Sequence, residues 1–139
     1  MKDKGAVAKL YRLERWLYCH KLKIMANIIY REIQILFSCV IPPTCKIGEG
    51  LHIAHGIGIV LHHNIEFGER CTIYQNVTIG GGDNIKIGDD FYIGANAVIV
   101  GKVNIGNNVK IGALTFVNFD VKDNCTVVGC KGKQIGGIK

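Results

Sequence analysis

The chain has 139 residues, enough for one domain with a small appendage, and 48% of them are hydrophobic, which excludes a disordered protein. The formal net charge is +6, and residues 1–39 carry eight Lys or Arg against three Asp or Glu. This basic segment is either a solvated helix face or a surface for an anionic membrane or an acidic partner. No nucleic-acid-binding motif accompanies the charge, so no nucleic acid is expected as a partner.

The six cysteines show no CxxC pair and no regular spacing, which indicates neither a zinc ribbon nor a disulfide scaffold. The sequence contains no apolar run of 18 residues and no signal-peptide pattern. These features together predict a cytoplasmic protein with reduced thiols.

Residues 1–39 form an N-terminal helical segment, in which one or two amphipathic helices are predicted over 6–39, divided near 19–23. Aromatic side chains such as Trp16 and Tyr18 add surface that needs a partner. That partner is the end of the following repeat, another subunit or a membrane interface. Covering the repeat is the expected role, because an open end exposes unpaired strand edges.

Residues 40–128 are predicted to form a domain built on a repeat of six residues. Aliphatic residues fall at every sixth place, and apolar or small residues follow four positions later: Ile87, Ile93, Ile99, Ile105, Ile111 and Val117, then Phe91, Ala97, Val103, Val109, Thr115 and Val121. This period fits neither an amphipathic helix nor a strand and is typical of a solenoid of short stacked strands. If three repeats make one triangular turn, residues 41–127 form four to five coils. The pattern is predicted to end at Val121, and residues 129–139 form a basic, glycine-rich tail.

Two extra residues interrupt the repeat at each of two places, between Ile53 and Leu61 and between Ile79 and Ile87. Solenoids carry such insertions on one face, often the binding face. His55 lies in the first interruption beside a glycine, where a substrate can reach an imidazole suited to general-base catalysis.

A metal cluster is the alternative interpretation of this region, because His52, His62 and His63 lie close to His55 in the sequence. His62 and His63 are neighbours in the chain and are expected to point to opposite sides of a strand. No Asp, Glu or Cys completes a plausible ligand set nearby, so no metal is expected.

Two runs resemble the hexapeptide-repeat acyltransferases, in particular serine acetyltransferase and the related polysaccharide and sugar O-acetyltransferases. The first run is Lys46–Leu51 followed by His-Gly-Ile-Gly-Ile-Val at 55–60, and the second is Tyr-Gln-Asn-Val-Thr-Ile-Gly-Gly at 74–81. The resemblance covers about residues 40–128. It implies a mainly β protein built on a left-handed parallel β-helix, and a homotrimer that binds acetyl-CoA between adjacent prisms.

The resemblance also implies roles for individual residues. His55 would be the general base that activates an acceptor hydroxyl. The cofactor-binding residues would be Gly80 and Gly81 through their backbone amides, Ala95 and Ala113 along the pantetheine arm, and Lys110, Lys131 and Lys133 at the nucleotide phosphates.

Three departures from the serine acetyltransferase pattern bear on these expectations. Ala54 replaces the Asp that precedes the catalytic His, and the loop at 82–86 is shorter and has no His. Both favour a sugar or polysaccharide-precursor hydroxyl over serine, and a lipid-carried acceptor would suit peripheral membrane contact through residues 1–39. Val40 stands where a carboxylate would orient the imidazole; Glu66, Asp83 or a neighbouring subunit are the candidate substitutes.

Two other functions stay open at this point. One is a non-catalytic trimeric scaffold, suggested by Val40. The other is a zinc-dependent β-helix of the carbonic anhydrase type, which needs three histidines converging across a subunit boundary.

Overall fold

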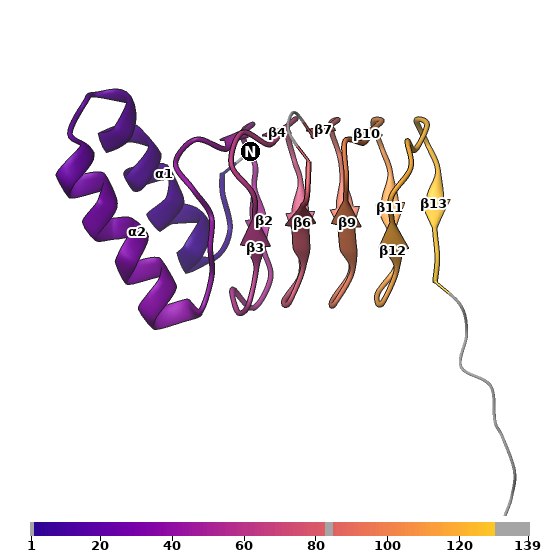
Figure 1. Ribbon diagram of the computed structural model, residues 1–139, viewed down its shortest axis with the longest axis horizontal. Coiled ribbons are helices and arrows are strands. Elements are labelled where there is room, and N and C mark those ends of the chain that lie inside the picture. The colour runs from indigo at the N-terminus through magenta and orange to yellow at the C-terminus, as the bar shows by residue number, and fades with distance from the viewer. Residues whose placement is uncertain (1, 83–84, 130–139) are drawn as a thin grey trace, which may run out of the picture.

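The computed structural model describes residues 2–82 and 85–129. Within these residues, two helices, α1 (Ala6–Cys19) and α2 (Lys23–Phe37), precede a solenoid of short parallel strands (Figure 1). The helices divide at residues 20–22, as predicted, where Lys21 adopts a left-handed conformation with φ 64°. None of the helices in the described residues is long and apolar enough to span a membrane.

The strands contain two or three residues each. In the described part of the chain they are β1 (Lys46–Ile47), β2 (His52–Ile53), β3 (Val60–Leu61), β4 (Glu66–Phe67), β5 (Thr72–Ile73), β6 (Thr78–Gly80), β7 (Lys86–Ile87), β8 (Tyr92–Ile93), β9 (Val98–Val100), β10 (Asn104–Ile105), β11 (Lys110–Ile111), β12 (Phe116–Val117) and β13 (Thr126–Val127).

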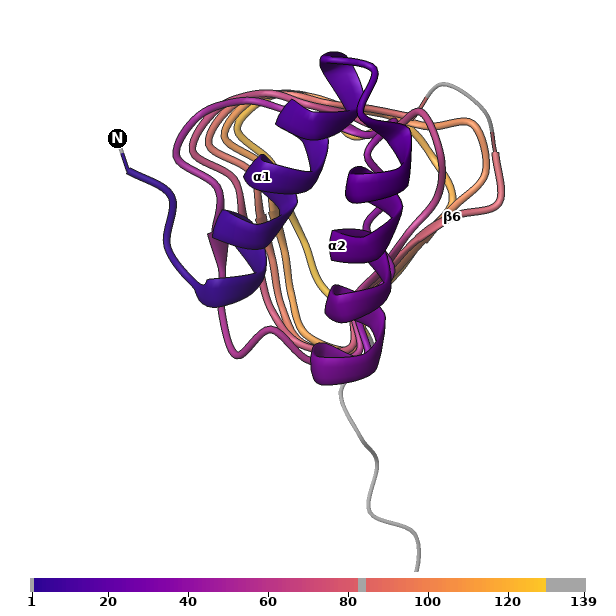
Figure 2. The ribbon, with the colours of Figure 1, turned by 90° about the vertical axis from the view of Figure 1, so that its left-hand side faces the viewer.

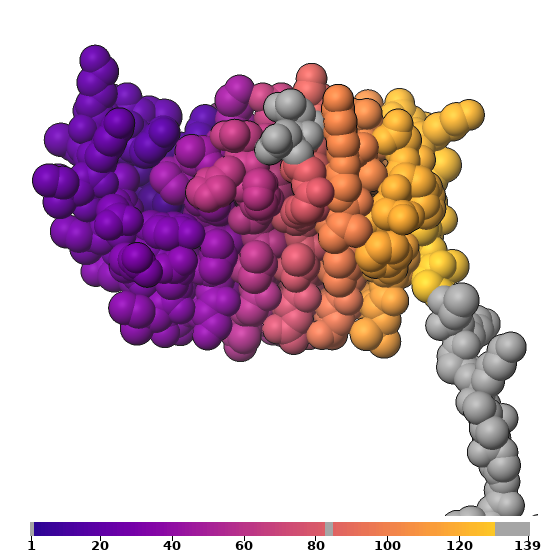
Figure 3. Space-filling view, viewed as in Figure 1, coloured from indigo at the N-terminus to yellow at the C-terminus, as the bar shows by residue number. Residues whose placement is uncertain are grey.

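These strands form the three sides of a triangular prism. The first sheet contains β1, β4, β7 and β10, the second β2, β5, β8, β11 and β13, and the third β3, β6, β9 and β12. Viewed from the helical end, the chain runs counter-clockwise as the coils recede, so the solenoid is left-handed, as the resemblance implies (Figure 2). The third sheet faces the viewer in Figures 1 and 3.

The interior of the prism consists of aliphatic ladders. In the second sheet, Ile53, Ile73, Ile93 and Ile111 follow one another in register, and all are buried. A two-residue strand cannot bury its inner side chain alone, so the core exists only because successive coils stack. Cys71 also lies in this interior and is buried as a free thiol.

Strand register confirms both interruptions and reveals a third irregularity. His52 pairs with Thr72 and Thr72 pairs with Tyr92, each twenty residues on, whereas Tyr92 pairs with Lys110, eighteen residues on. Val121 bridges Ile105, only sixteen residues before it, because the turn at 118–120 is two residues shorter than the repeat requires. The predicted role of Val121 as the second inward position after Val117 is therefore wrong.

The prediction that the pattern ends at Val121 is also wrong. Strand β13 pairs with β11 through Thr126 and Lys110, and it adds one more rung to the second sheet. Most of the predicted tail, residues 130–139, lies outside the described residues.

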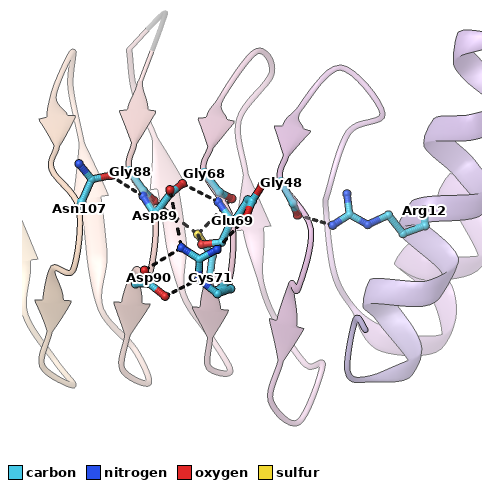
Figure 4. A network of polar contacts seen from close by, with 10 residues as sticks. Arg12, Gly48, Gly68, Glu69, Cys71, Gly88, Asp89, Asp90 and Asn107 are labelled. Carbon is cyan, nitrogen blue, oxygen red and sulfur yellow. Dashed lines mark hydrogen bonds and ion pairs between the residues drawn. The ribbon is translucent and has the colours of Figure 1, made fainter. Parts of the chain in front are cut away.

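Side chains at the corner between the first and second sheets bond to the backbone of the preceding coil (Figure 4). An Asp89 carboxylate oxygen accepts a hydrogen bond from the Glu69 amide at 2.8 Å, and the Asn107 side-chain oxygen accepts one from the Asp89 amide at 2.9 Å. Arg70 pairs with Asp90 at 2.7 Å across the same two coils. These contacts fix the spacing of the coils at this corner.

The helices lie side by side across the first coil (Figure 2). The Tyr11 hydroxyl donates a hydrogen bond to the Cys45 carbonyl oxygen at 2.7 Å, and Arg12 donates to the carbonyl oxygens of Ile47 and Gly48. The hairpin therefore covers the open end of the solenoid, which is the first of the three expected partners, whereas Trp16 and Tyr18 remain exposed.

Candidate functional site

His55 lies on the corner between the second and third sheets, where the segment joining β2 and β3 bulges beyond the later coils (Figure 2). The side chain is exposed, and its backbone is left-handed with φ 66°. Gly56 and Gly58 have φ values of 48° and 67°, so three of four successive residues adopt a conformation that is costly without glycine. The two extra residues of the first interruption thus lift His55 out of the packed coil.

Helices α1 and α2 support this bulge from the end of the prism. The Gly58 amide donates a hydrogen bond to the Phe37 carbonyl oxygen at 3.3 Å, where α2 ends. A Cβ added to Gly56 would lie 2.8 Å from a Val7 methyl carbon, so α1 packs closely against the bulge. A shallow hollow of about 190 Å³ opens beside the His55 ring, between the start of α1 and the end of α2.

Aromatic rings continue from His55 along the prism. The His55 ring centroid is 6.2 Å from that of Tyr74, which is 5.3 Å from that of Tyr92 in the next coil. These three rings form one wall that a ligand lying along the corner would contact.

The carboxylates proposed to orient His55 lie elsewhere or outside the described residues. Val40 pairs with Val60 at the edge of the third sheet and offers no polar group. Glu66 lies on the first sheet, where a 2.7 Å hydrogen bond from Lys46 holds the pKa of its carboxyl below the ordinary value. Asp83 is outside the described residues, and a residue of a neighbouring subunit is the other candidate.

Ala95 and Ala113 follow His55 along the same corner, in later coils. The Leu114 amide donates to the Ala95 carbonyl oxygen at 3.0 Å, which places the two alanines one coil apart in the expected stack. Lys110 is exposed on the second sheet, beside Tyr92. The two other predicted phosphate-binding residues, Lys131 and Lys133, lie outside the described residues.

Gly80 and Gly81 lie on a different corner, between the third and first sheets. Gly80 ends β6, where its carbonyl oxygen accepts a hydrogen bond from the Gly101 amide at 3.0 Å, and Gly81 has φ 73°. Within one chain, the structure does not bring these glycines to the His55 ring, because the third sheet separates the two corners.

Sequence reasoning did not assign His62 to this second corner. A Cβ added to Gly80 would lie 3.2 Å from the His62 Cβ, so His62 borders the glycine from the preceding coil. His62 and His63 are both exposed, with ring centroids 5.6 Å apart, so the expectation that they point to opposite sides is wrong. They follow β3 and lie in the turn, where strand alternation does not apply. His62 and Gly80 are 18 residues apart, the length of an uninterrupted coil, and this spacing could have revealed their contact.

No group of three or more His, Cys, Asp or Glu residues is placed to hold a metal ion in residues 2–82 and 85–129. The third sheet, which joins the two corners, carries exposed apolar side chains such as Val60 and Phe116. Figure 3 shows this face as parallel bands of the coils. An exposed apolar face of this kind is typical of a surface covered by another molecule.

Comparison with known proteins agrees with this architecture. A family model described as "Bacterial transferase hexapeptide (six repeats)" matches residues 84–118. The chain is 34% identical to the serine acetyltransferase of Synechococcus elongatus, over 90% of this chain and 54% of that protein. It is 35% identical to that of Helicobacter pylori, over 90% of this chain and 77% of that protein.

Solved serine acetyltransferases share the fold. The Neisseria gonorrhoeae enzyme in complex with serine superposes with a TM-score of 0.83 at 35% identity, covering 92% of this chain and 55% of that one. A serine acetyltransferase in complex with CoA gives 0.81 at 32% identity, covering 88% and 52%. The chain thus spans about half the length of several of the proteins it matches. In sequence and in fold, the chain belongs to the serine acetyltransferase family of hexapeptide-repeat acyltransferases.

Proposed function

We propose that this protein is an acetyl-CoA-dependent O-acetyltransferase that works as a homotrimer, with each active site formed between two copies. The observation that carries the proposal is the exposed His55 imidazole on the same corner as Ala95 and Ala113. In a ring of three copies, a rotation places one corner of each chain against a different corner of the next. Such a contact would bring the Gly80 corner of one copy to the His55 corner of its neighbour and would cover the apolar third sheet.

The proposed reaction transfers the acetyl group in two steps. The His55 imidazole takes the proton of the acceptor hydroxyl as that oxygen attacks the thioester carbonyl carbon. The tetrahedral oxyanion then accepts hydrogen bonds from backbone amides around Gly80 and Gly81 of the neighbouring copy. When the intermediate collapses, the carbon–sulfur bond breaks and the CoA thiolate takes the proton back from the imidazolium. Ala95 and Ala113 would bind the pantetheine amides, and Lys110, Lys131 and Lys133 would meet the nucleotide phosphates.

The acceptor that we propose is a hydroxyl of a sugar or a polysaccharide precursor. Ala54 precedes the imidazole, is buried and offers no carboxylate to an amino group. Serine is the competing acceptor, since the relatives are serine acetyltransferases and one is solved with serine. A cytoplasmic location, where acetyl-CoA is available, stays a prediction.

Release of the CoA thiol tests this proposal. Wild-type protein with acetyl-CoA and a panel of sugar hydroxyls or serine should release thiol in an acceptor-dependent manner. We expect His55→Ala to lower this rate by about 10²–10⁴-fold, the usual contribution of a general base. His52→Ala is the matched control, because His52 is three residues away on β2 and has no role in the mechanism. Equal loss in both variants would contradict the role of His55, and a preference for serine would overturn the sugar acceptor.

The second candidate function is a non-catalytic trimeric scaffold, favoured by Val40 in place of an orienting carboxylate. It predicts that wild type and His55→Ala release thiol at the same background rate with every acceptor. Thermal stabilisation by free CoA separates the two functions further, because a ligand that binds only the folded state must raise its apparent stability.

A further inference from the structure

The helical hairpin is apolar on its outer face as well as on the face that covers the solenoid. On α2, Ala26 and Ile33 are buried against the rest of the protein. On the opposite side, Ile24 is 81% exposed and Ile35 is 78% exposed. A helix that covers the end of the solenoid and faces water on its other side would carry polar residues on that outer side. The exposed apolar side chains therefore need another explanation.

Helix α1 extends the same surface. Leu13 and Trp16 are three residues apart and so lie on one stripe of α1, and Trp16 is 54% exposed. Figure 2 shows the two helices side by side across the end of the prism, facing away from the coils. We call this surface the hairpin face; its members are Leu13, Trp16, Ile24, Met25, Ile28, Ile35 and Leu36, all exposed.

The charges around the hairpin face are almost all positive. The exposed cations of the two helices and their connection are Lys9, Lys21, Lys23 and Arg31, and the one exposed acid among these described residues is Glu32. Lys21 and Lys23 line a surface hollow together with Leu22, Ile24 and Met25, so cationic and apolar side chains adjoin directly. Arg31 lies between Ile28 and Ile35 in the stripe on α2.

We propose that the hairpin face binds an anionic lipid bilayer, with α1 and α2 lying in the plane of the interface. Helices of this kind place apolar side chains at the boundary between headgroups and acyl chains, and their lysines and arginines at anionic headgroups. An aromatic residue such as Trp16 favours the same boundary. An exposed apolar surface with Lys21 and Lys23 beside it and Arg31 within it matches an anionic bilayer in both hydrophobicity and charge. Contact with a membrane would also bring the catalytic prism to acceptors carried on lipids.

The chain contains a single Trp, so Trp16 reports on the proposed surface directly. The full-length protein is mixed with vesicles of phosphatidylcholine, with or without phosphatidylglycerol, and both tryptophan emission and co-sedimentation are measured. We expect a blue shift and co-sedimentation with the anionic vesicles, weakened by salt because the charge contribution is screened.

Two variants and one control separate the contributions. Ile28→Ser combined with Ile35→Ser should lower vesicle partitioning by about tenfold for each lost side chain. Lys21→Glu combined with Lys23→Glu should remove the preference for anionic vesicles. Val128→Ser is the matched control, because Val128 is 72% exposed just after β13, at the opposite end of the prism, and should bind as wild type does. Circular dichroism melting curves establish that each variant is folded.

Several results would overturn the proposal. Binding of the Ile28→Ser/Ile35→Ser variant equal to that of wild type would show that the hairpin face is not the membrane surface, as would the absence of any vesicle binding. A blue shift that grows with protein concentration in the absence of lipid, and disappears in that variant, would assign the face to a second copy of the chain. Thiol release with a water-soluble acceptor is independent of all these outcomes, so failure here leaves the proposed function standing.

Discussion

Glu14 makes the stability of this protein depend on pH in a predictable direction. The residue is 0% exposed, and neither carboxylate oxygen has a hydrogen-bond partner in the described residues. Burial raises the pKa of this carboxyl from 4.5 to about 8. Tyr30 of α2 and Cys45 are the titratable groups nearby, and burial raises the pKa of each, so they stay neutral below pH 8.

The direction of the pH dependence follows from the protons that the folded and unfolded states bind. The folded state retains the Glu14 proton up to about pH 8, whereas the unfolded chain releases it near pH 4.5, so stability falls as pH rises between these values. The slope is about 1.4 kcal/mol per pH unit, which gives a loss of roughly 2 to 3 kcal/mol between pH 5 and pH 7. Glu14→Gln keeps the size of the neutral acid and cannot ionise, so it should remove this loss.

Urea unfolding at pH 5, 6 and 7, followed by circular dichroism, measures the effect. The free energy of unfolding of Glu14→Gln should fall with pH less steeply than that of wild type. Glu32→Gln is the matched control, because Glu32 is exposed on α2 and should leave the slope unchanged. Parallel pH profiles for wild type and Glu14→Gln would refute the reasoning.

Three further predictions concern packing and reactivity. Tyr11→Phe removes the hydrogen bond that joins α1 to the first coil, and should lower the free energy of unfolding by about 1 kcal/mol in urea titrations. Gly58→Ala should distort the bulge, because φ is 67° at this residue and the new Cβ would overlap the Asn76 side chain. The rate of thiol release should fall while the far-ultraviolet circular dichroism spectrum is retained. An unchanged rate would count against the bulge as part of the site. A thiol reagent should modify exposed Cys19 in the native protein but not Cys71, because Cys71 is buried and burial raises the pKa of its thiol to about 11. Peptide mapping by mass spectrometry measures the labelling, and labelled Cys71 would contradict this prediction.

The period of six predicted the solenoid because each inward position is fixed by stacking alone. Residues such as Ile93 and Ile99 recur at constant spacing and are buried in consecutive sheets of the same coil. The end of the repeat could not be predicted in this way. The turn before Val121 is two residues short, and only pairing with Ile105 shows that a further coil follows.

The bulge that carries His55 could be predicted from the sequence, because a change in the repeat spacing shows where the chain leaves the packed coil. An eight-residue spacing around His55 indicates a bulge, and glycines at 56 and 58 permit the left-handed backbone that the structure shows. The distance between the His55 corner and the Gly80 corner depends on which sheet each interruption follows, which the period alone does not give. The sequence of α2 contains two apolar stripes at helical spacing, but the spacing alone does not show which stripe faces the solenoid and which stays exposed.

Each proposed active site combines the His55 corner of one copy with the Gly80 corner of another. The most direct measurement is thiol release by trimers assembled from equal amounts of His55→Ala and Gly81→Val chains, each inactive alone. Random assembly leaves about a quarter of the junctions between copies with both corners intact, so the mixture should recover about a quarter of wild-type activity. A mixture that stays at the background of its two parents, although mixed trimers have formed, would contradict the claim.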